Sequence, residues 1–189
     1  MKILIASDIH GSSYYAEKLY QVYERDNPDQ IFLLGDYLYH GPKSNPPKDY
    51  DVKKTIEILN QMESKIIGLK GLCDSEADLK SLAFEIEDGF RLLNVDGVKM
   101  YLTHGHMNDL LPKRDLDSIL ITGMTHEYSM EKKYINPGSL SLPPEGQKHT
   151  YIMYEDHSFY LFDIDKNHLL QKLTLKGITK DRKYLNPYS

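Results

Sequence analysis

The chain contains 189 residues, of which 40% are hydrophobic and 27% are charged, a composition typical of a soluble globular protein with one core. Its net charge of -5 and pI near 5.9 exclude a general basic surface, so nucleic acid is not expected as a partner. The single cysteine, Cys73, excludes an internal disulfide and indicates a reducing cytoplasm. The start, MKILIAS, turns polar too early for a signal peptide, and no apolar run could span a bilayer, so a cytoplasmic location without membrane contact is expected.

The first half of the chain alternates between expected strands and expected helices. Apolar runs rich in β-branched residues indicate three buried strands, at 2–7, 30–34 and 65–70. Apolar residues at helical spacing indicate two helices, at 13–25 and 52–62. Strands and helices in this order form βαβ units, so a parallel sheet is expected.

The second half is richer in strands. Asp96-Gly97 lies between two apolar runs and predicts a hairpin. The strands expected here cover residues 91–95, 98–103, 118–122, 133–135, 150–155 and 159–164. Asn136-Pro137-Gly138-Ser139 is expected to form a tight turn. Because neither a repeat nor a linker interrupts the pattern, we expect a single domain over residues 1–189, with a short strand and tail over 173–189.

Aspartate, histidine and cysteine collect just after the ends of the expected strands. These residues are Asp8, His10, Asp36, Cys73, Asp74, His104, His106 and His126. Ligands of open α/β sheets bind at the C-terminal ends of the strands, and a core disfavours unpaired carboxylates and imidazoles. Carboxylates combined with imidazoles suit manganese, iron or zinc better than calcium or magnesium. The sequence therefore predicts a divalent metal site at one edge of the sheet.

Other histidines and tyrosines have ordinary interpretations. The remaining histidines are expected to be solvated or hydrogen bonded, and they are His40, His149, His157 and His168. Tyr37 and Tyr39 lie near the expected sheet edge, where they either pack or stack on a base or aryl group of a ligand.

Five short motifs occur in a fixed order along the chain. They are Asp8-Ile9-His10, Gly35-Asp36, Gly71-Leu72-Cys73-Asp74, Thr103-His104-Gly105-His106 and Gly123-Met124-Thr125-His126. In this order they resemble the motifs of the calcineurin-like metallophosphoesterases, and most of all those of the small bacterial YfcE-type phosphodiesterases. The resemblance runs from residue 1 to about residue 164. It implies an α/β fold, namely a four-layer α/β/β/α sandwich with a two-metal site at one edge.

The resemblance also implies a role for each ligand. Asp8, His10, Asp36 and His126 would hold the first metal. Asp36 would bridge to a second metal, which His104 would also bind. His106 is expected to support the ligands from behind, rather than to bind metal itself.

Two positions depart from the family pattern. The family completes its second metal site with an asparagine and a histidine, and Leu72 and Met124 stand at these positions. Leucine has no ligand atom, and a thioether is a soft ligand that suits these ions poorly. We expect Leu72 and Met124 to face each other and to fill the second metal position with apolar contact. The catalytic residues implied are Asp36, His104 and Cys73, where Cys73 would assist the leaving group or would instead be a small buried hydrophobic side chain.

The implied function is a metal-dependent phosphoesterase that hydrolyses a small phosphodiester with metal-activated water. Manganese is the expected ion, with iron, zinc or nickel as alternatives. One ion is expected, and the two replacements predict a weakened or single-metal site with impaired activity. The alternative is a catalytically silent binding or scaffold protein, similar to the metallophosphoesterase-fold subunit of retromer. The sequence leaves a homo-oligomer open.

Overall fold

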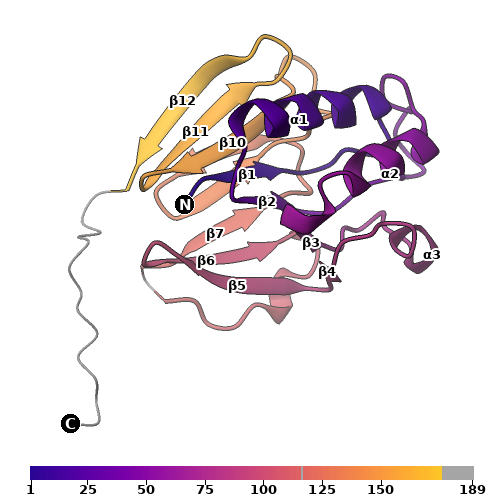
Figure 1. Cartoon of the computed structure of the whole chain (residues 1–189). Coiled ribbons are helices and arrows are strands. Elements are labelled where there is room, and N and C mark those ends of the chain that lie inside the picture. The colour runs from indigo at the N-terminus through magenta and orange to yellow at the C-terminus, as the bar shows by residue number, and fades with distance from the viewer. Residues whose placement is uncertain (116, 176–189) are drawn as a thin grey trace, which may run out of the picture.

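The computed structural model describes residues 1–115 and 117–175, which form two packed sheets with helices against one of them (Figure 1). The α-helices are α1 (Ser13–Asp26), α2 (Val52–Asn60) and α3 (Glu76–Leu79), and the 3-10 helices are η1 (Glu63–Lys65) and η2 (Asn108–Leu110). The strands are β1 (Ile3–Ala6), β2 (Gln30–Leu33), β3 (Ile66–Leu69), β4 (Ile86–Glu87), β5 (Phe90–Val95), β6 (Val98–Thr103), β7 (Ile119–Thr122), β8 (Tyr128–Glu131), β9 (Tyr134–Pro137), β10 (Thr150–Glu155), β11 (Ser158–Asp163) and β12 (His168–Thr174). No helix in the described residues is long and apolar enough to cross a membrane.

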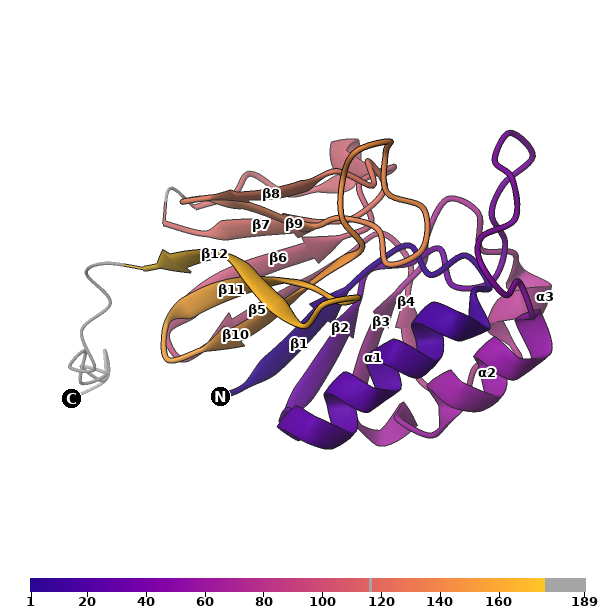
Figure 2. The ribbon, with the colours of Figure 1, turned by 90° about the horizontal axis from the view of Figure 1, so that it is seen from above.

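Both sheets are mixed, and each contains a parallel set of strands. The seven-stranded sheet has the order β12-β11-β10-β1-β2-β3-β4, in which β1 to β4 are parallel to one another. The five-stranded sheet has the order β5-β6-β7-β9-β8, in which β6, β7 and β9 are parallel. Figure 2 shows the two sheets stacked, with α1 and α2 on the outer side of the seven-stranded sheet. The predicted parallel sheet is confirmed.

The alternation of side chains along β1 explains the layers. Leu4 and Ala6 pack with the helices, whereas Ile3 and Ile5 pack against the five-stranded sheet. Successive side chains of a strand point to opposite faces, so a strand covered on both sides must be apolar throughout. The predicted α/β class is therefore confirmed. In the described residues, the connection from β6 to β7 contains only η2, so the helical layer beyond the five-stranded sheet is reduced.

The first helix begins immediately after the first motif. Ser12 caps α1, because its side chain accepts a hydrogen bond from the backbone N–H of Tyr15. Asn27 ends the helix in the left-handed conformation, with φ of 42°. Helix α1 is thus capped at both ends, and its N-cap Ser12 directly follows the loop that carries the first motif.

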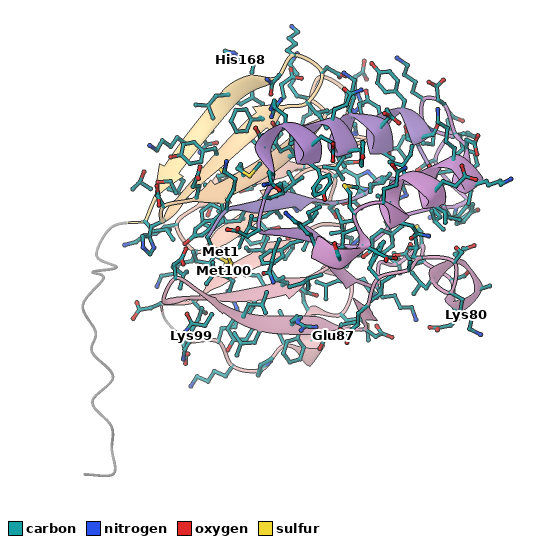
Figure 3. All side chains as sticks on the ribbon, in the orientation of Figure 1. Met1, Lys80, Glu87, Lys99, Met100 and His168 are labelled. Carbon is teal, nitrogen blue, oxygen red and sulfur yellow. The ribbon has the colours of Figure 1, made fainter. Side chains whose placement is uncertain are left out.

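The expected elements are found within a few residues of their expected ends, with some corrections. The helix α3 and the strands β4 and β8 were not expected. Asn136 and Pro137 end strand β9, so the prediction that the turn begins at Asn136 was wrong. The last strand begins at His168, at the outer edge of the seven-stranded sheet (Figure 3), rather than at Leu173. The predicted tail over 176–189 lies outside the described residues.

Candidate metal centre

The motif residues lie in loops that follow the C-terminal ends of parallel strands. Asp8 and His10 follow β1, and Asp36 follows β2, the neighbouring strand. Backbone hydrogen bonds join these two loops, since the N–H of Asp8 donates to Gly35 at 3.1 Å and the N–H of His10 donates to Asp36 at 2.9 Å. His126 approaches from the other sheet, in the loop after β7. The two sheets therefore deliver these side chains to one shared edge.

Asp8, His10, Asp36 and His126 form one cluster. Each offers a ligand atom, and the four atoms lie within 4.8 Å of one another. His126 Nε2 is 3.3 Å from Asp8 Oδ1, and His10 Nε2 is 3.8 Å from Asp36 Oδ2. Asp8, His10 and Asp36 are buried. Two carboxylates and two imidazoles in this space form a ligand set that suits a divalent transition metal.

Backbone carbonyls orient the histidine rings. The Nδ1–H of His10 donates to the carbonyl of Tyr39 at 2.7 Å, and that of His126 donates to Leu142 at 2.8 Å. His104 does the same with Leu34 at 2.7 Å. A carbonyl oxygen can only accept, so Nδ1 carries the proton and, in the neutral ring, Nε2 presents a lone pair. This arrangement is the one that prepares histidines to bind metals through Nε2.

The contacts among the ligand atoms fit a cation. The Nε2 atoms of His10 and His126 lie 3.1 Å apart, so two lone pairs face each other when both rings are neutral. Asp8 Oδ1 and His104 Nε2 are buried and have no hydrogen-bond partner in the described residues. Buried polar atoms normally have a partner, and a cation between these atoms would supply one.

Burial and charge shift the pKa values of the clustered groups in different directions. Burial lowers the pKa of His10, and the nearby Asp8 offsets this only in part. Burial also acts to lower the pKa of His104, but Asp36 and Asp8 outweigh it and raise the pKa to about 9. In turn burial acts to raise the pKa of Asp36, but His104 outweighs it, so the pKa is lowered and the carboxylate stays ionised. The Asp36 carboxylate therefore keeps a negative charge, which attracts cations.

The backbone is strained at this site. Asp8, His10, Asp36, Met124 and His126 all adopt positive φ values, between 50° and 65°. The left-handed region costs residues other than glycine about 1–3 kcal/mol each, although aspartate and histidine tolerate it better than most. Such strain persists where the surrounding structure holds the backbone for a functional purpose.

The environment of Leu72 and Met124 differs from the expectation. Leu72 is 62% exposed and Met124 is 40% exposed, so the prediction that they fill the second metal position by apolar contact was wrong. The loops explain the difference, because hydrogen bonds to the carboxylates hold their backbones. The N–H of Met124 donates to Asp8 Oδ2 at 3.2 Å, and that of Cys73 donates to Asp36 Oδ1 at 2.7 Å. His104 lies beside the cluster, with Nε2 3.5 Å from Asp36 Oδ2.

The Cys73 thiol is partly buried near the centre. Its sulfur lies 3.4 Å from where a Cβ on Gly41 would be. Burial, together with the negative charge of Asp36, raises the pKa of the thiol to about 12. At neutral pH the thiol therefore stays protonated and is a weak acid.

Asp74 has a structural role that the sequence reasoning did not give it. Its buried carboxylate accepts hydrogen bonds from the backbone N–H groups of Asp36 at 2.8 Å, Tyr37 at 2.9 Å and Gly71 at 2.7 Å. A side chain at position 71 would collide with Asp36, which explains the glycine there. The sequence shows that Asp74 follows an expected strand, but it does not show which backbone groups its carboxylate binds.

The segment 136–142 supports the loops from the other side. Asn136 Nδ2 donates to the carbonyl of Gly123 at 2.9 Å, and Ser139 Oγ donates to the carbonyl of Asp8 at 2.8 Å. The end of β9 and the chain after it therefore hold both ligand loops in place.

The other expected residues have mixed outcomes. His149 is hydrogen bonded to the carbonyl of Leu140 and stacks on Tyr15, and His168 is exposed, as expected. Tyr37 is fully buried and donates to the carbonyl of Leu69, so it packs in the core rather than stacking on a ligand. The His106 ring is 5.4 Å from that of His104, and its Nδ1 makes no hydrogen bond to the part of the chain that the structure describes.

Comparisons with known proteins agree with this arrangement. The profile of the calcineurin-like phosphoesterase superfamily domain matches residues 1–158. The chain is 30% identical to phosphodiesterase YfcE of Escherichia coli K12 over 93% of its own length and 98% of that protein. It is also 30% identical to phosphodiesterase MJ0936 of Methanocaldococcus jannaschii, over 73% of its own length and 83% of that protein. The solved structure of E. coli YfcE, a phosphoesterase, superposes with a TM-score of 0.86 at 31% identity, over 93% of this chain and all of that one.

The chain therefore belongs to the calcineurin-like phosphoesterase superfamily. Within it, the chain is similar to the YfcE-type enzymes over nearly all of its length. The predicted fold and the predicted metal-dependent phosphoesterase, a hydrolase, are confirmed. The alternative of a catalytically silent scaffold is not favoured.

Proposed function

We propose that the protein hydrolyses small phosphodiesters with a divalent metal ion held by Asp8, His10, Asp36 and His126. The observation that carries the proposal is the convergence of four ligand atoms within 4.8 Å of one another. The names of its relatives, phosphodiesterase YfcE and phosphodiesterase MJ0936, support a diester as substrate. Manganese is the ion we propose, because mixed carboxylate and imidazole ligands suit it.

We further propose that one ion binds firmly and that a second binds weakly or not at all. Asp36 and His104 are the donors at the second position. Leu72 and Met124, at the two other family positions, offer it no nitrogen or oxygen. A cation bound by the chain lowers the pKa of water and neutralises charge on the phosphoryl group. With one cation the second half of this stabilisation is missing, which commonly costs a hundred- to a thousandfold in rate, or about 2.7–4 kcal/mol.

The remaining residues of the centre bind and orient. We assign to His104 the binding of a phosphoryl oxygen, because its buried Nε2 has no partner in the described residues and faces the cluster. Asp36 holds its position through the N–H of Cys73, and its carboxylate faces both His10 and His104. The proposed catalytic role of the Cys73 thiol stays a prediction, and its high pKa favours a contribution through the backbone N–H instead.

Hydrolysis of bis(p-nitrophenyl) phosphate tests the proposal. Purified protein is treated with EDTA, reloaded with Mn²⁺, and compared with an Asp36→Asn variant prepared in the same way. We expect Mn²⁺-stimulated turnover in the wild type and at least about a hundredfold less in the variant. Elemental analysis of the same samples counts the bound ions. Equal turnover in both proteins would contradict the proposal.

We also propose that the protein is cytoplasmic and that it folds as a single domain. The unpaired thiol of Cys73 supports a reducing compartment. The proposed single domain is supported by the two sheets sharing one core between them.

A further inference from the structure

Two large apolar side chains are exposed beside the centre. Leu72, at 62%, is the most exposed large hydrophobic side chain in the described residues, and Met124 is 40% exposed. Isolated exposed hydrophobic residues are ordinary on protein surfaces, but here two of them occupy loops that hold the ligands. Core packing does not explain why these two exposed positions carry hydrophobic side chains.

Hydrogen bonds tie both residues to the ligand carboxylates. The N–H of Met124 donates to Asp8 Oδ2 at 3.2 Å. Leu72 lies between Gly71, where an added Cβ would collide with Asp36, and Cys73, whose N–H donates to Asp36 Oδ1 at 2.7 Å. Neither backbone can move away without breaking a contact to a metal ligand. Residues 72 and 124 therefore remain in loops held next to the centre.

The neighbours of Met124 show where its side chain lies. Met124 sits over Gly105, since a Cβ added to Gly105 would be 3.6 Å from Met124 Cβ and 3.9 Å from Met124 Sδ. Gly105 directly follows His104, so Met124 lies against the backbone next to the residue assigned to a phosphoryl oxygen. Tyr39 is 41% exposed, and its carbonyl accepts the hydrogen bond from His10. We call Tyr39, Leu72 and Met124 the apolar rim.

We infer that the apolar rim binds a large apolar or aryl ester group of the substrate while the centre binds its phosphate. The inference rests on the proposed function and narrows its substrate class to phosphodiesters that carry at least one such group. Ligand sites combine a few polar groups that orient the ligand with apolar walls that bind the rest of it. The ligands and His104 supply the polar groups here, and Leu72 and Met124 supply the walls. A small hydrated ester group gains nothing from these walls, because it leaves their apolar surface in water.

A binding experiment with two simple phosphodiesters tests this without any turnover. The protein, labelled at its methionine methyl groups with ¹³C and loaded with Zn²⁺, is titrated with diphenyl phosphate and, separately, with dimethyl phosphate. The spectrum of a Met124→Ala variant identifies the Met124 signal. We expect diphenyl phosphate to bind at least about tenfold more tightly and to shift the Met124 signal. We expect Leu72→Ala to reduce this preference by about five- to tenfold.

A matched control separates the apolar rim from general effects. Leu169, on β12 at the outer edge of the seven-stranded sheet, is 42% exposed, and Leu169→Ala should leave the preference for diphenyl phosphate unchanged. Equal affinity for the two diesters, no binding of either, or an unshifted Met124 signal would overturn the inference. Failure of the proposed function looks different, because the phenyl preference would then be present in a protein that hydrolyses no phosphodiester.

Discussion

The Nε2 atoms of His10 and His126 lie 3.1 Å apart, although the two rings come from different sheets. Each ring uses its Nδ1–H to donate to a backbone carbonyl, so neither neutral ring has a proton to place between the two nitrogens. With both rings neutral and no cation, the pair is held together by the fold and not by its own attraction. The fold therefore holds these two nitrogens in the arrangement that a metal requires.

This relationship predicts the behaviour of His126→Ala. We expect metal affinity, measured by calorimetry with Mn²⁺, to fall by at least about a hundredfold because a direct ligand is lost. We also expect the metal-free variant to melt at the same temperature as the metal-free wild type or higher, because facing lone pairs are removed. His168→Ala, at an exposed histidine of β12, is the control and should change neither quantity. An unchanged affinity in His126→Ala would contradict the ligand assignment.

The second prediction concerns Asp74, whose side chain contacts backbone N–H groups and not the ligand atoms of the cluster. Its carboxylate accepts three backbone N–H groups, two of them from Asp36 and Tyr37. In Asp74→Asn an amide N–H₂ would face donors, so the loop that carries Asp36 must shift. We expect metal affinity to fall by about ten- to a hundredfold, as measured by the same calorimetry. Asp117→Asn, at an exposed aspartate, should have no effect, and an unaffected Asp74→Asn would show that the loop holds without this carboxylate.

The thiol of Cys73 predicts a pH dependence. Burial and the charge of Asp36 raise its pKa to about 12, so at any pH below this the folded protein contains less thiolate than the unfolded chain, whose pKa is about 8.5. In metal-free protein the rate of alkylation by iodoacetamide should therefore keep rising with pH beyond 10. In urea the same chain should reach its maximum rate near pH 9–10. A folded-state rate that levels off near pH 8.5 would show that only access, and not the pKa, slows the reaction.

Much of the fold could be predicted because its signals are local. The strands β1 to β3 are apolar on both faces, and the spacing within 13–25 fixes α1 to within a residue of Asp26. The elements α3, β4 and β8 are as short, but α3 and β4 contain no buried residue and β8 contains one, so no apolar run marks them in the sequence. Pro137 looked like part of a turn, yet it ends a strand.

In the candidate site too, local features could be predicted from the sequence and long-range contacts could not. The motifs placed Asp8 and His126 correctly at strand ends, because strand ends are readable in the sequence. The exposure of Met124 was not readable, because it depends on a left-handed backbone and a hydrogen bond to a residue 116 positions away. The support that Ser139 gives Asp8 spans 131 positions and has no local signal either. Long-range hydrogen bonds, more than side-chain chemistry, decide where the replaced residues point.

The replaced residues give the last prediction, the restoration of a second metal. In Leu72→Asn with Met124→His, an amide oxygen and an imidazole nitrogen join Asp36 and His104 at the second position. We expect the number of bound metal ions, measured by elemental analysis, to rise from about one per chain to about two. Turnover of bis(p-nitrophenyl) phosphate should rise by a hundred- to a thousandfold. Adding Asp36→Asn removes the carboxylate shared by both positions and should abolish the gain. Because both native side chains are exposed, the new ligands must turn inward, and one replacement alone should gain little. Two ions in the wild type, or a single ion in the restored variant, would show that positions 72 and 124 do not control the second metal.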